Sequence, residues 1–368
     1  MRKLPWTKLS AGLVSLAIFS ALNFLIAFMY GLGKSVSEGR LTASNPALSV
    51  AEQIVRHLNI WDEAAIETAI DGYTQLPQPP TIVLLGSSLM MYPFWYVDSE
   101  PHPHCADSIV EHHHAEALQA RLRKVGLARS TVYNLATPLQ MVSDSYMYAC
   151  NYLKGSKAPR AIVIGVSPRE FYDSEFKSAE DTVNFTDQGW NVAGKHIARF
   201  YFRSWEQYAD FTLRKLSFLY GQRSVMQQFL AARLLSMYGQ SVGTGAQSTF
   251  GLCKFKQHYA GIGTARLHAQ YKFLQRLCGH CRAQNIKIIL VNMPIPRQNR
   301  ALLPPGLYTR YESDLGKLAS QEHIAYLNLA ERREFAGASN FVDAVHMNQF
   351  GGERLINDLL PTIKAQLR

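Results

Sequence analysis

Residues 81–95 read TIVLLGSSLMMYPFW, and this stretch gives the clearest indication of the fold. Four apolar residues, Ile82 to Leu85, run directly into Gly86 and two serines. A short uninterrupted apolar run is typical of a strand buried in a parallel sheet, and the residues after it indicate a tight turn at the carboxyl end of that strand. Ser88 is therefore a candidate nucleophile, and it is equally a candidate cap for the helix that follows.

Similar apolar runs recur along the rest of the chain and alternate with helical patterns. The runs lie at 130–136, 161–167, 286–294 and 324–330, and helical patterns lie near 108–125, 140–154, 264–284 and 308–321, with a last helix from about 349. Such alternation predicts βαβ units and a parallel sheet covered by helices on both faces. We expect an α/β domain over residues 81–368, with a doubly wound sheet of flavodoxin-like order.

The alternation is interrupted between about 171 and 262, where we expect a helical insertion. Residues 195–238 within it are rich in basic and aromatic side chains. That composition fits helices with one apolar and one basic face. The insertion could be a cap packed on the sheet with a solvated basic face, or an element in direct contact with a membrane, and the two can both hold.

Residues 1–33 are expected to form a transmembrane anchor. Arg2, Lys3 and Lys8 precede roughly 22 uncharged residues, which is enough to cross a ~30 Å hydrocarbon core. Basic residues before the run favour a cytoplasmic N-terminus. The sequence thus predicts a single-pass protein of the cytoplasmic membrane with its catalytic domain in the periplasm or at the cell surface, and a cleaved signal peptide is the alternative. Residues 34–80 are expected to be a stalk and linker.

Composition narrows the range of partners. The chain has 38 Lys and Arg against 28 Asp and Glu, a net charge of +10, which suits a membrane surface or an anionic polymer. No nucleic-acid module is recognisable, so we expect no nucleic-acid partner. The five cysteines are too few for a disulfide scaffold. CGHC at 278–281 matches a redox motif, but it lies late in a helical run and not after a strand, which favours a structural pair.

Chemistry in a doubly wound sheet is expected just after the strands, where Ser88 lies. A serine becomes nucleophilic only with a base, and the base needs an orienting carboxylate. Residues 340–352, NFVDAVHMNQFGG, offer both, because Asp343 and His346 are three positions apart. This spacing allows the carboxylate to hold the imidazole tautomer while the other ring nitrogen faces outward.

Together, GSSL at 86–89 and DAVHMN at 343–348 resemble the SGNH, or GDSL-like, hydrolases and acyltransferases. The resemblance covers roughly residues 81–367. It is strongest to the membrane-anchored branch that includes alginate O-acetylation proteins and the D-alanyl transfer protein of teichoic acids. It implies Ser88, Asp343 and His346 as catalytic residues, with Ser87 at the position of the family's aspartate.

The resemblance also implies an oxyanion hole made by the N–H of the nucleophile, a glycine after the second strand and an asparagine after the third. Here no glycine follows the second strand, and Ser167 stands at the asparagine position. Backbone amides near Thr137 and the hydroxyl of Ser167 are therefore expected to donate. Arg169 is expected either to bind an anionic group of the substrate or to form an ion pair with the insertion.

Two short segments are rich in histidine, namely PHPHC at 101–105 and EHHHAE at 111–116. Such a cluster could bind zinc, but consecutive histidines on a helix point in different directions and cannot all reach one ion. We expect a solvated or pocket-lining surface, no metal site and no cofactor.

These observations favour a membrane-anchored serine acyltransferase or esterase that acts on an extracytoplasmic polysaccharide or acyl-ester substrate. By resemblance, it would work beside a multi-span membrane acyltransferase. The first alternative is a catalytically weak SGNH-like scaffold that binds polysaccharide or such a partner. The second is a zinc or thiol redox protein.

Overall fold

The computed structural model describes residues 60–100, 109, 111–172 and 264–368, with isolated positions between 205 and 259. The chain divides into two compact units. One comprises Trp61–Tyr201 and Gly245–Arg368, and it contains the sheet. The other, Met1–Ile60 with Phe202–Thr244, lies almost wholly outside the described residues.

The sheet has five strands, and each pair of neighbours is parallel. Its order is β2-β1-β3-β4-β5, and the strands are β1 (Ile82–Leu85), β2 (Val132–Asn134), β3 (Ala161–Val166), β4 (Lys287–Asn292) and β5 (Ala325–Asn328). Every residue of β1 and β3 is buried. Each strand lies within one of the five apolar runs, so the structure confirms the expected α/β sheet with flavodoxin-like order.

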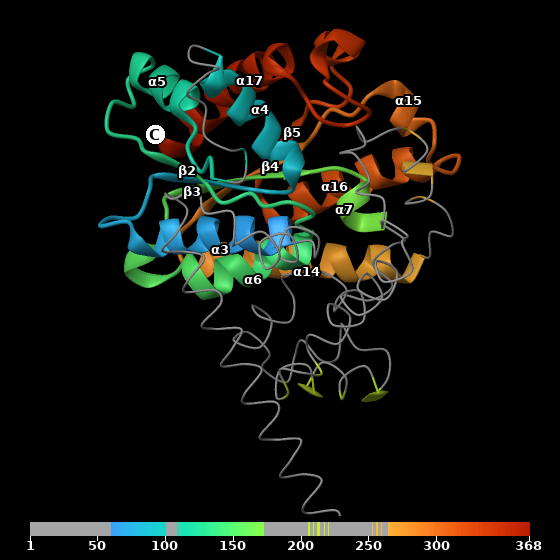
Figure 1. The fold of residues 1–368 in the computed structure, drawn as a ribbon, viewed down its shortest axis with the longest axis horizontal. Helices are drawn as coiled ribbons and strands as arrows, with labels where there is room; N and C mark the ends of the chain where they lie inside the picture. Colours follow the sequence, from blue (N-terminus) through green and yellow to red (C-terminus); the bar gives the residue numbers. More distant parts are fainter. Residues whose placement is uncertain are drawn as a thin grey trace, which may run out of the picture. The chain divides into compact units, whose positions relative to one another are not determined.

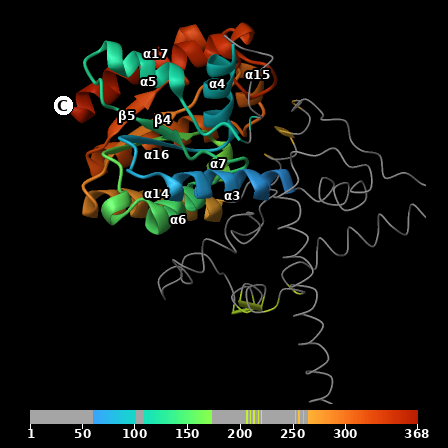
Figure 2. The same cartoon turned by 60° about the vertical axis from the view of Figure 1, so that its left-hand side comes forward.

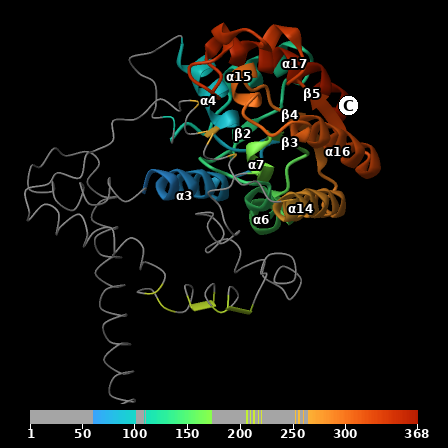
Figure 3. The same ribbon diagram turned by 90° about the vertical axis from the view of Figure 1, so that its right-hand side faces the viewer.

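Helices cover both faces of the sheet (Figure 1). One face carries α4 (Ser88–Ser99), α5 (Glu116–Lys124) and α17 (Gln349–Leu367). The other face carries α3 (Ile60–Gln75), α6 (Val142–Tyr152), α14 (Thr264–Ala283) and α16 (Leu307–Glu322), as the turned views also show (Figures 2 and 3). Shorter helices are α7 (Arg169–Tyr172) and α15 (Arg297–Arg300), with 3-10 turns at Gly155–Lys157, Arg333–Phe335 and Ala338–Asn340.

Helix α3 extends the packed unit into residues that we expected to be linker. Ala69 and Tyr73 are buried on it. The hydroxyl of Tyr133, in the middle of β2, donates to the Ala69 carbonyl at 2.7 Å, and the Tyr73 hydroxyl donates to the Lys157 carbonyl at 2.5 Å. Residues that precede the proline-rich segment QLPQPP at 75–80 therefore also cover the sheet, and this segment joins two parts of one core.

The expected transmembrane segment lies outside the described residues, as does most of the expected insertion. Within the ranges that the structure describes, no helix combines the length and apolar character needed to cross a bilayer.

The CGHC segment lies near the end of α14. Cys278 and Cys281 are both buried and both free thiols. Burial raises the pKa of Cys278 to about 12 and raises that of Cys281 as well. Protonated, buried thiols are poor nucleophiles, so this geometry agrees with a structural pair.

Candidate active site

The turn after β1 fixes the two serines in different roles. Gly86 has a φ of +141°, and a Cβ there would lie 2.7 Å from the carbonyl oxygen of Gly165 in β3. The strand can therefore turn into α4 at this point only with glycine. Ser87 then has an extended backbone and caps α4, since its hydroxyl oxygen accepts the Leu89 N–H. Ser88 is the first residue of the helix.

The loop before α17 holds a histidine against a carboxylate. Oδ1 of Asp343 accepts the backbone N–H groups of Val345 and His346 at 2.9 and 2.8 Å. The loop closes with the Val342 N–H donating to the His346 carbonyl at 2.9 Å. These bonds leave Oδ2 of Asp343 facing the imidazole, with Nδ1 of His346 at 2.7 Å.

Ser88, His346 and Asp343 form a continuous hydrogen-bonded chain. Oγ of Ser88 lies 2.9 Å from Nε2 of His346, and the Asp343 carboxylate is on the opposite side of the ring. An ionised carboxylate only accepts, so Nδ1 carries a proton, and in the neutral imidazole Nε2 then accepts from the serine hydroxyl. The structure thus brings together, across 258 residues of sequence, the three side chains that we expected to form a catalytic triad.

The charge of Asp343 is stabilised by its partners. Burial raises the pKa of this carboxyl, but hydrogen bonds from the His346 side chain and from two backbone N–H groups, with the charge of His346, outweigh burial and hold the pKa below its ordinary value. His346 itself is 2% exposed. The pair is therefore preorganised with an ionised carboxylate behind the base.

Two glycines bring this loop onto α4. Gly351 and Gly352 are buried in the first turn of α17, which Asn348 caps by accepting the Gly351 N–H. A Cβ on Gly352 would overlap the carbonyl oxygen of Pro93 in α4. The close approach of α17 to α4 therefore places the His346 loop beside the helix that begins at Ser88.

A buried carboxylate braces the serine turn. Glu170, on α7, is 2% exposed and accepts the Ser87 hydroxyl at 2.6 Å. It also accepts the N–H and the hydroxyl of Ser167, at 2.8 and 2.5 Å. The turns after β1 and β3 are thereby tied together. Glu170 was not predicted from the sequence, although its position three residues after Ser167 in a short turn was a usable signal.

The two residues expected to complete an oxyanion hole, Ser167 and Thr137, direct their N–H and hydroxyl groups to other atoms of the protein. Both donors of Ser167 bind Glu170. The Thr137 N–H is directed to the Gly86 carbonyl and to the side chain of Gln140, and its hydroxyl also lies 3.1 Å from that side chain. Thr137 and Ser167 thus brace the turns around Ser88, because their N–H and hydroxyl groups bond within the protein.

Arg169 and two of the clustered histidines are buried. Arg169 is 8% exposed on α7, which favours a structural role over binding of a substrate anion. His112 and His113 are buried, not solvated, because His112 bonds to Asp98 at 3.0 Å and His113 stacks on Tyr133. Residues 101–105 lie outside the described residues. In the described part of the chain, no group of three or more His, Cys, Asp or Glu side chains could hold a metal ion.

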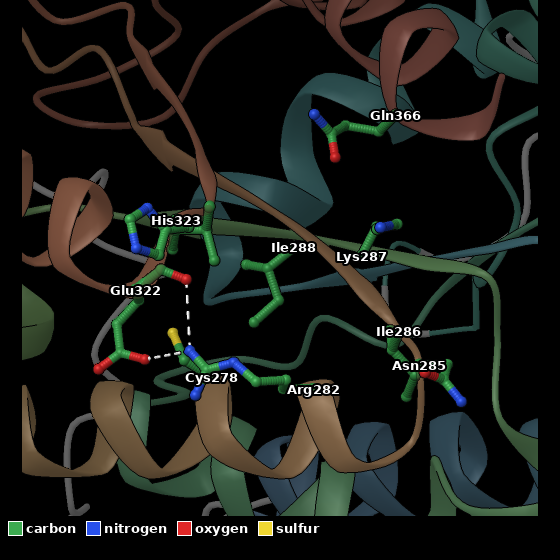
Figure 4. Close-up of a pocket in the computed structure, with 10 residues that line it drawn as sticks. Cys278, Arg282, Asn285, Ile286, Lys287, Ile288, Glu322, His323 and Gln366 are labelled. Carbon is green, nitrogen blue, oxygen red and sulfur yellow. Dashed lines mark hydrogen bonds and ion pairs between the residues drawn. The ribbon is translucent and has the colours of Figure 1, made fainter.

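A pocket of about 270 Å³ lies at the amino ends of β4 and β5, away from Ser88 (Figure 4). It is lined by the end of α14, the first residues of β4 and the turn into β5, and Arg282 is bound there to Glu322 at 2.6 Å. Ser88 follows the carboxyl end of β1, whereas this pocket lies at the amino ends of β4 and β5. It is therefore separate from the triad.

No protein-family model and no curated protein matches this sequence. Among solved structures, the chain is similar to TesA, with 13% identity over 77% of this chain and 98% of that one and a TM-score of 0.38. It is also similar to a GDSL-like lipase from Bacteroides thetaiotaomicron, with 11% identity over 82% and 98% of the two chains and a TM-score of 0.37. These values are too low to assign a family.

Proposed function

We propose that the protein is a serine esterase or acyltransferase of the SGNH type, with Ser88 as its nucleophile. The observation that carries the proposal is the hydrogen-bonded chain from Ser88 through His346 to Asp343. A serine, an imidazole and a carboxylate in this order are the groups that acyl transfer through a serine ester requires.

In the first half-reaction, Oγ of Ser88 attacks the carbonyl carbon of an ester and gives its proton to Nε2 of His346. Asp343 stabilises the resulting imidazolium through the bond at Nδ1. The tetrahedral intermediate collapses when His346 protonates the leaving alkoxide, and an acyl-serine remains. In the second half-reaction, His346 deprotonates water or a sugar hydroxyl, which attacks the acyl-serine and restores the serine hydroxyl.

The oxyanion requires donors, and the first of them is the backbone N–H of Ser88. This group lies in the first turn of α4, where an N–H has no intrahelical acceptor, and the helix dipole favours negative charge there. Because Thr137 and Ser167 are engaged, the further donors of this hole are expected from other residues or from substrate.

We infer that the acceptor is an extracytoplasmic polysaccharide hydroxyl and that residues 1–33 anchor the chain in the cytoplasmic membrane. The uncharged run and its preceding basic residues support the anchor, and the positive net charge supports an anionic polymer or membrane surface nearby. An anchor would keep Ser88 close to a multi-span membrane acyltransferase that supplies acyl groups.

The test is acetyl-ester cleavage by the full chain in detergent, with p-nitrophenyl acetate as donor. We expect the Ser88→Ala variant to lose at least about 10³-fold in kcat, because the proposed acyl intermediate forms on the Ser88 hydroxyl. A matched control is Ser313→Ala, an exposed serine on α16, which should leave kcat unchanged. Equal activity of the wild type and Ser88→Ala would contradict the proposal.

Transfer and hydrolysis are then separated by adding an acceptor. A transferase should move the acetyl group to added oligosaccharide, measured by mass spectrometry, and its rate of p-nitrophenol release should rise with acceptor concentration. An esterase should release acetate alone at a rate that the oligosaccharide does not change.

The engaged donors of Thr137 and Ser167 favour one alternative, a scaffold that binds polysaccharide or a membrane partner without efficient catalysis. This alternative predicts that Ser88→Ala retains polysaccharide binding and biological function, whereas the enzymatic proposal predicts that function is lost with Ser88.

A further inference from the structure

Helix α4 carries a second side chain toward the triad. Tyr92 is four residues after Ser88, and residues at this spacing lie on the same face of a helix, one turn apart. The helix that presents the nucleophile therefore also presents an aromatic ring beside it. Tyr92 is half-buried at this position.

The ring of Tyr92 lies flat on the imidazole of His346. The ring centroids are 4.0 Å apart and the ring planes differ by 15°. The neighbouring aromatic on the same helix, Tyr96, packs differently, because it lies 6.1 Å from Tyr92 and meets it at 45°.

The stack restricts a motion that the hydrogen bonds of the triad permit. The bonds to Ser88 and Asp343 both act at the ring edge. A ring held at its edge by two such bonds can still tilt about the line that joins them, and a tilt weakens both bonds by bending them. A second ring stacked on one face blocks the tilt toward that face.

The phenol is also suited to a neutral role. Burial, followed by the nearby charge of Asp343 and by Tyr96, raises the pKa of Tyr92 above its ordinary value. The ring therefore stays uncharged and does not compete for the proton from Ser88. An electron-rich ring face also attracts the imidazolium that forms when the base takes that proton.

We propose that Tyr92 is a positioning residue that holds the His346 imidazole in the plane of Ser88 and Asp343. The inference rests on the proposed function, in which His346 is the base. It adds a requirement that the triad alone does not contain, namely a flat side chain one helical turn after the nucleophile.

The test uses the full chain with Tyr92→Leu, Tyr92→Met and Tyr92→Phe, and with Tyr96→Leu as a matched control on the same helix. Tyr92→Leu should lower kcat for p-nitrophenyl acetate by about 10- to 100-fold with little change in KM, because a misplaced base slows chemistry and not binding. Tyr92→Phe keeps the ring and should restore kcat to within about twofold of wild type. Tyr96→Leu should leave kcat unchanged.

A second readout does not depend on activity. The proton on Nδ1 of His346, bonded to Asp343, should give a low-field proton resonance that is visible only while its exchange with water is slow, and His346→Ala assigns it by its loss. The signal should broaden in Tyr92→Leu and Tyr92→Met and stay sharp in Tyr92→Phe and Tyr96→Leu.

The two readouts separate failure of this inference from failure of the proposed function. A wild type without esterase activity would reject the function, while the resonance would still decide on Tyr92. The inference is overturned if a folded Tyr92→Leu variant, or Tyr92→Met where the leucine variant does not fold, keeps the sharp signal. It is also overturned if an active enzyme keeps its kcat in those variants.

Discussion

Ser87 and Ser88 are adjacent and have the same side chain, but their hydroxyl groups have different partners. Ser87 has the extended backbone of a helix cap and is bound by Glu170, whereas Ser88 is helical and its hydroxyl faces His346. The sequence alone left either serine as the cap, because the distinction depends on where the helix begins. The resemblance placed the nucleophile at Ser88, and the hydrogen bonds are consistent with that assignment.

The first prediction concerns Asp343 and pH. Its pKa is lowered in the folded state, so its contribution to the free energy of unfolding is present above the unfolded-state pKa and is lost as pH falls through the folded-state pKa. Asp343→Asn cannot titrate. The difference in unfolding free energy between wild type and Asp343→Asn, measured by urea denaturation, should therefore shrink as pH falls from 7 to below the ordinary carboxyl value of 3.8. The same variant should lose about 10²- to 10⁴-fold in kcat.

Asp358 on α17 provides a control, because its pKa is shifted in the direction opposite to that of Asp343. Burial raises its pKa, and the lowering effect of Arg332 does not cancel this. A carboxyl of this kind is stabilised in its protonated form, so the wild type should lose stability relative to Asp358→Asn as pH rises through the acid range. Parallel pH dependence in the two pairs would contradict the assigned environments.

At the scale of elements, the site depends on how closely α17 packs on α4. The prediction is that Gly352→Ala destabilises the protein by about 1–3 kcal/mol, because a new methyl overlaps the Pro93 carbonyl and forces the helices apart. The same displacement moves His346 from Ser88, so kcat should fall with the melting temperature.

The matched control is Gly279→Ala in α14. This glycine is exposed, and a Cβ there has open space around it. Alanine is the better helix former, so stability should be unchanged or rise by up to about 1 kcal/mol, with kcat unaffected. A Gly352→Ala variant that behaves like Gly279→Ala would show that the close helix contact is not required.

Strands and most helices could be predicted from the sequence, because each strand lies within a short apolar run that alternates with helical patterns. Helix α3 was missed as part of the core, since its burial depends on Tyr133 and on the 3-10 turn at Gly155–Lys157, both distant in sequence. The burial of His112 has the same kind of cause. Its partner, Asp98, also accepts the first N–H groups of α5, and no local pattern reveals that.

The triad itself could be predicted because its members follow strand ends in a recognised order. The partners of the nearby hydrogen-bond donors could not be predicted. The bonds from Thr137 to Gln140 and from Ser167 to Glu170 depend on the geometry of the turns. Tyr92 was also not predicted, since its stack on His346 requires two helices and a loop to meet.

In the whole molecule, the two ends of the parallel strands have different roles. The triad lies beyond the carboxyl ends of the strands, and the pocket around Arg282 lies at their amino ends. In a parallel sheet, the carboxyl ends of the strands thus hold the reactive residues, and the two faces pack against helices.

The prediction at this scale concerns residues 1–33. The full chain should remain in the membrane fraction after carbonate extraction, and a variant that lacks residues 1–33 should be released with unchanged kcat, because the triad lies in the unit that begins at Trp61. N-terminal sequencing distinguishes the alternative, since a cleaved signal peptide would leave a mature chain that begins after the apolar run.

Covalent labelling of the full chain by a fluorophosphonate tests whether Ser88 is an activated nucleophile. We expect one adduct, mapped to Ser88 by peptide mass spectrometry in the wild type and in Ser87→Ala, and no adduct in Ser88→Ala or His346→Ala. A folded wild type without an adduct, or a Ser88→Ala variant that still labels at the wild-type rate, would show that Ser88 is not the activated nucleophile.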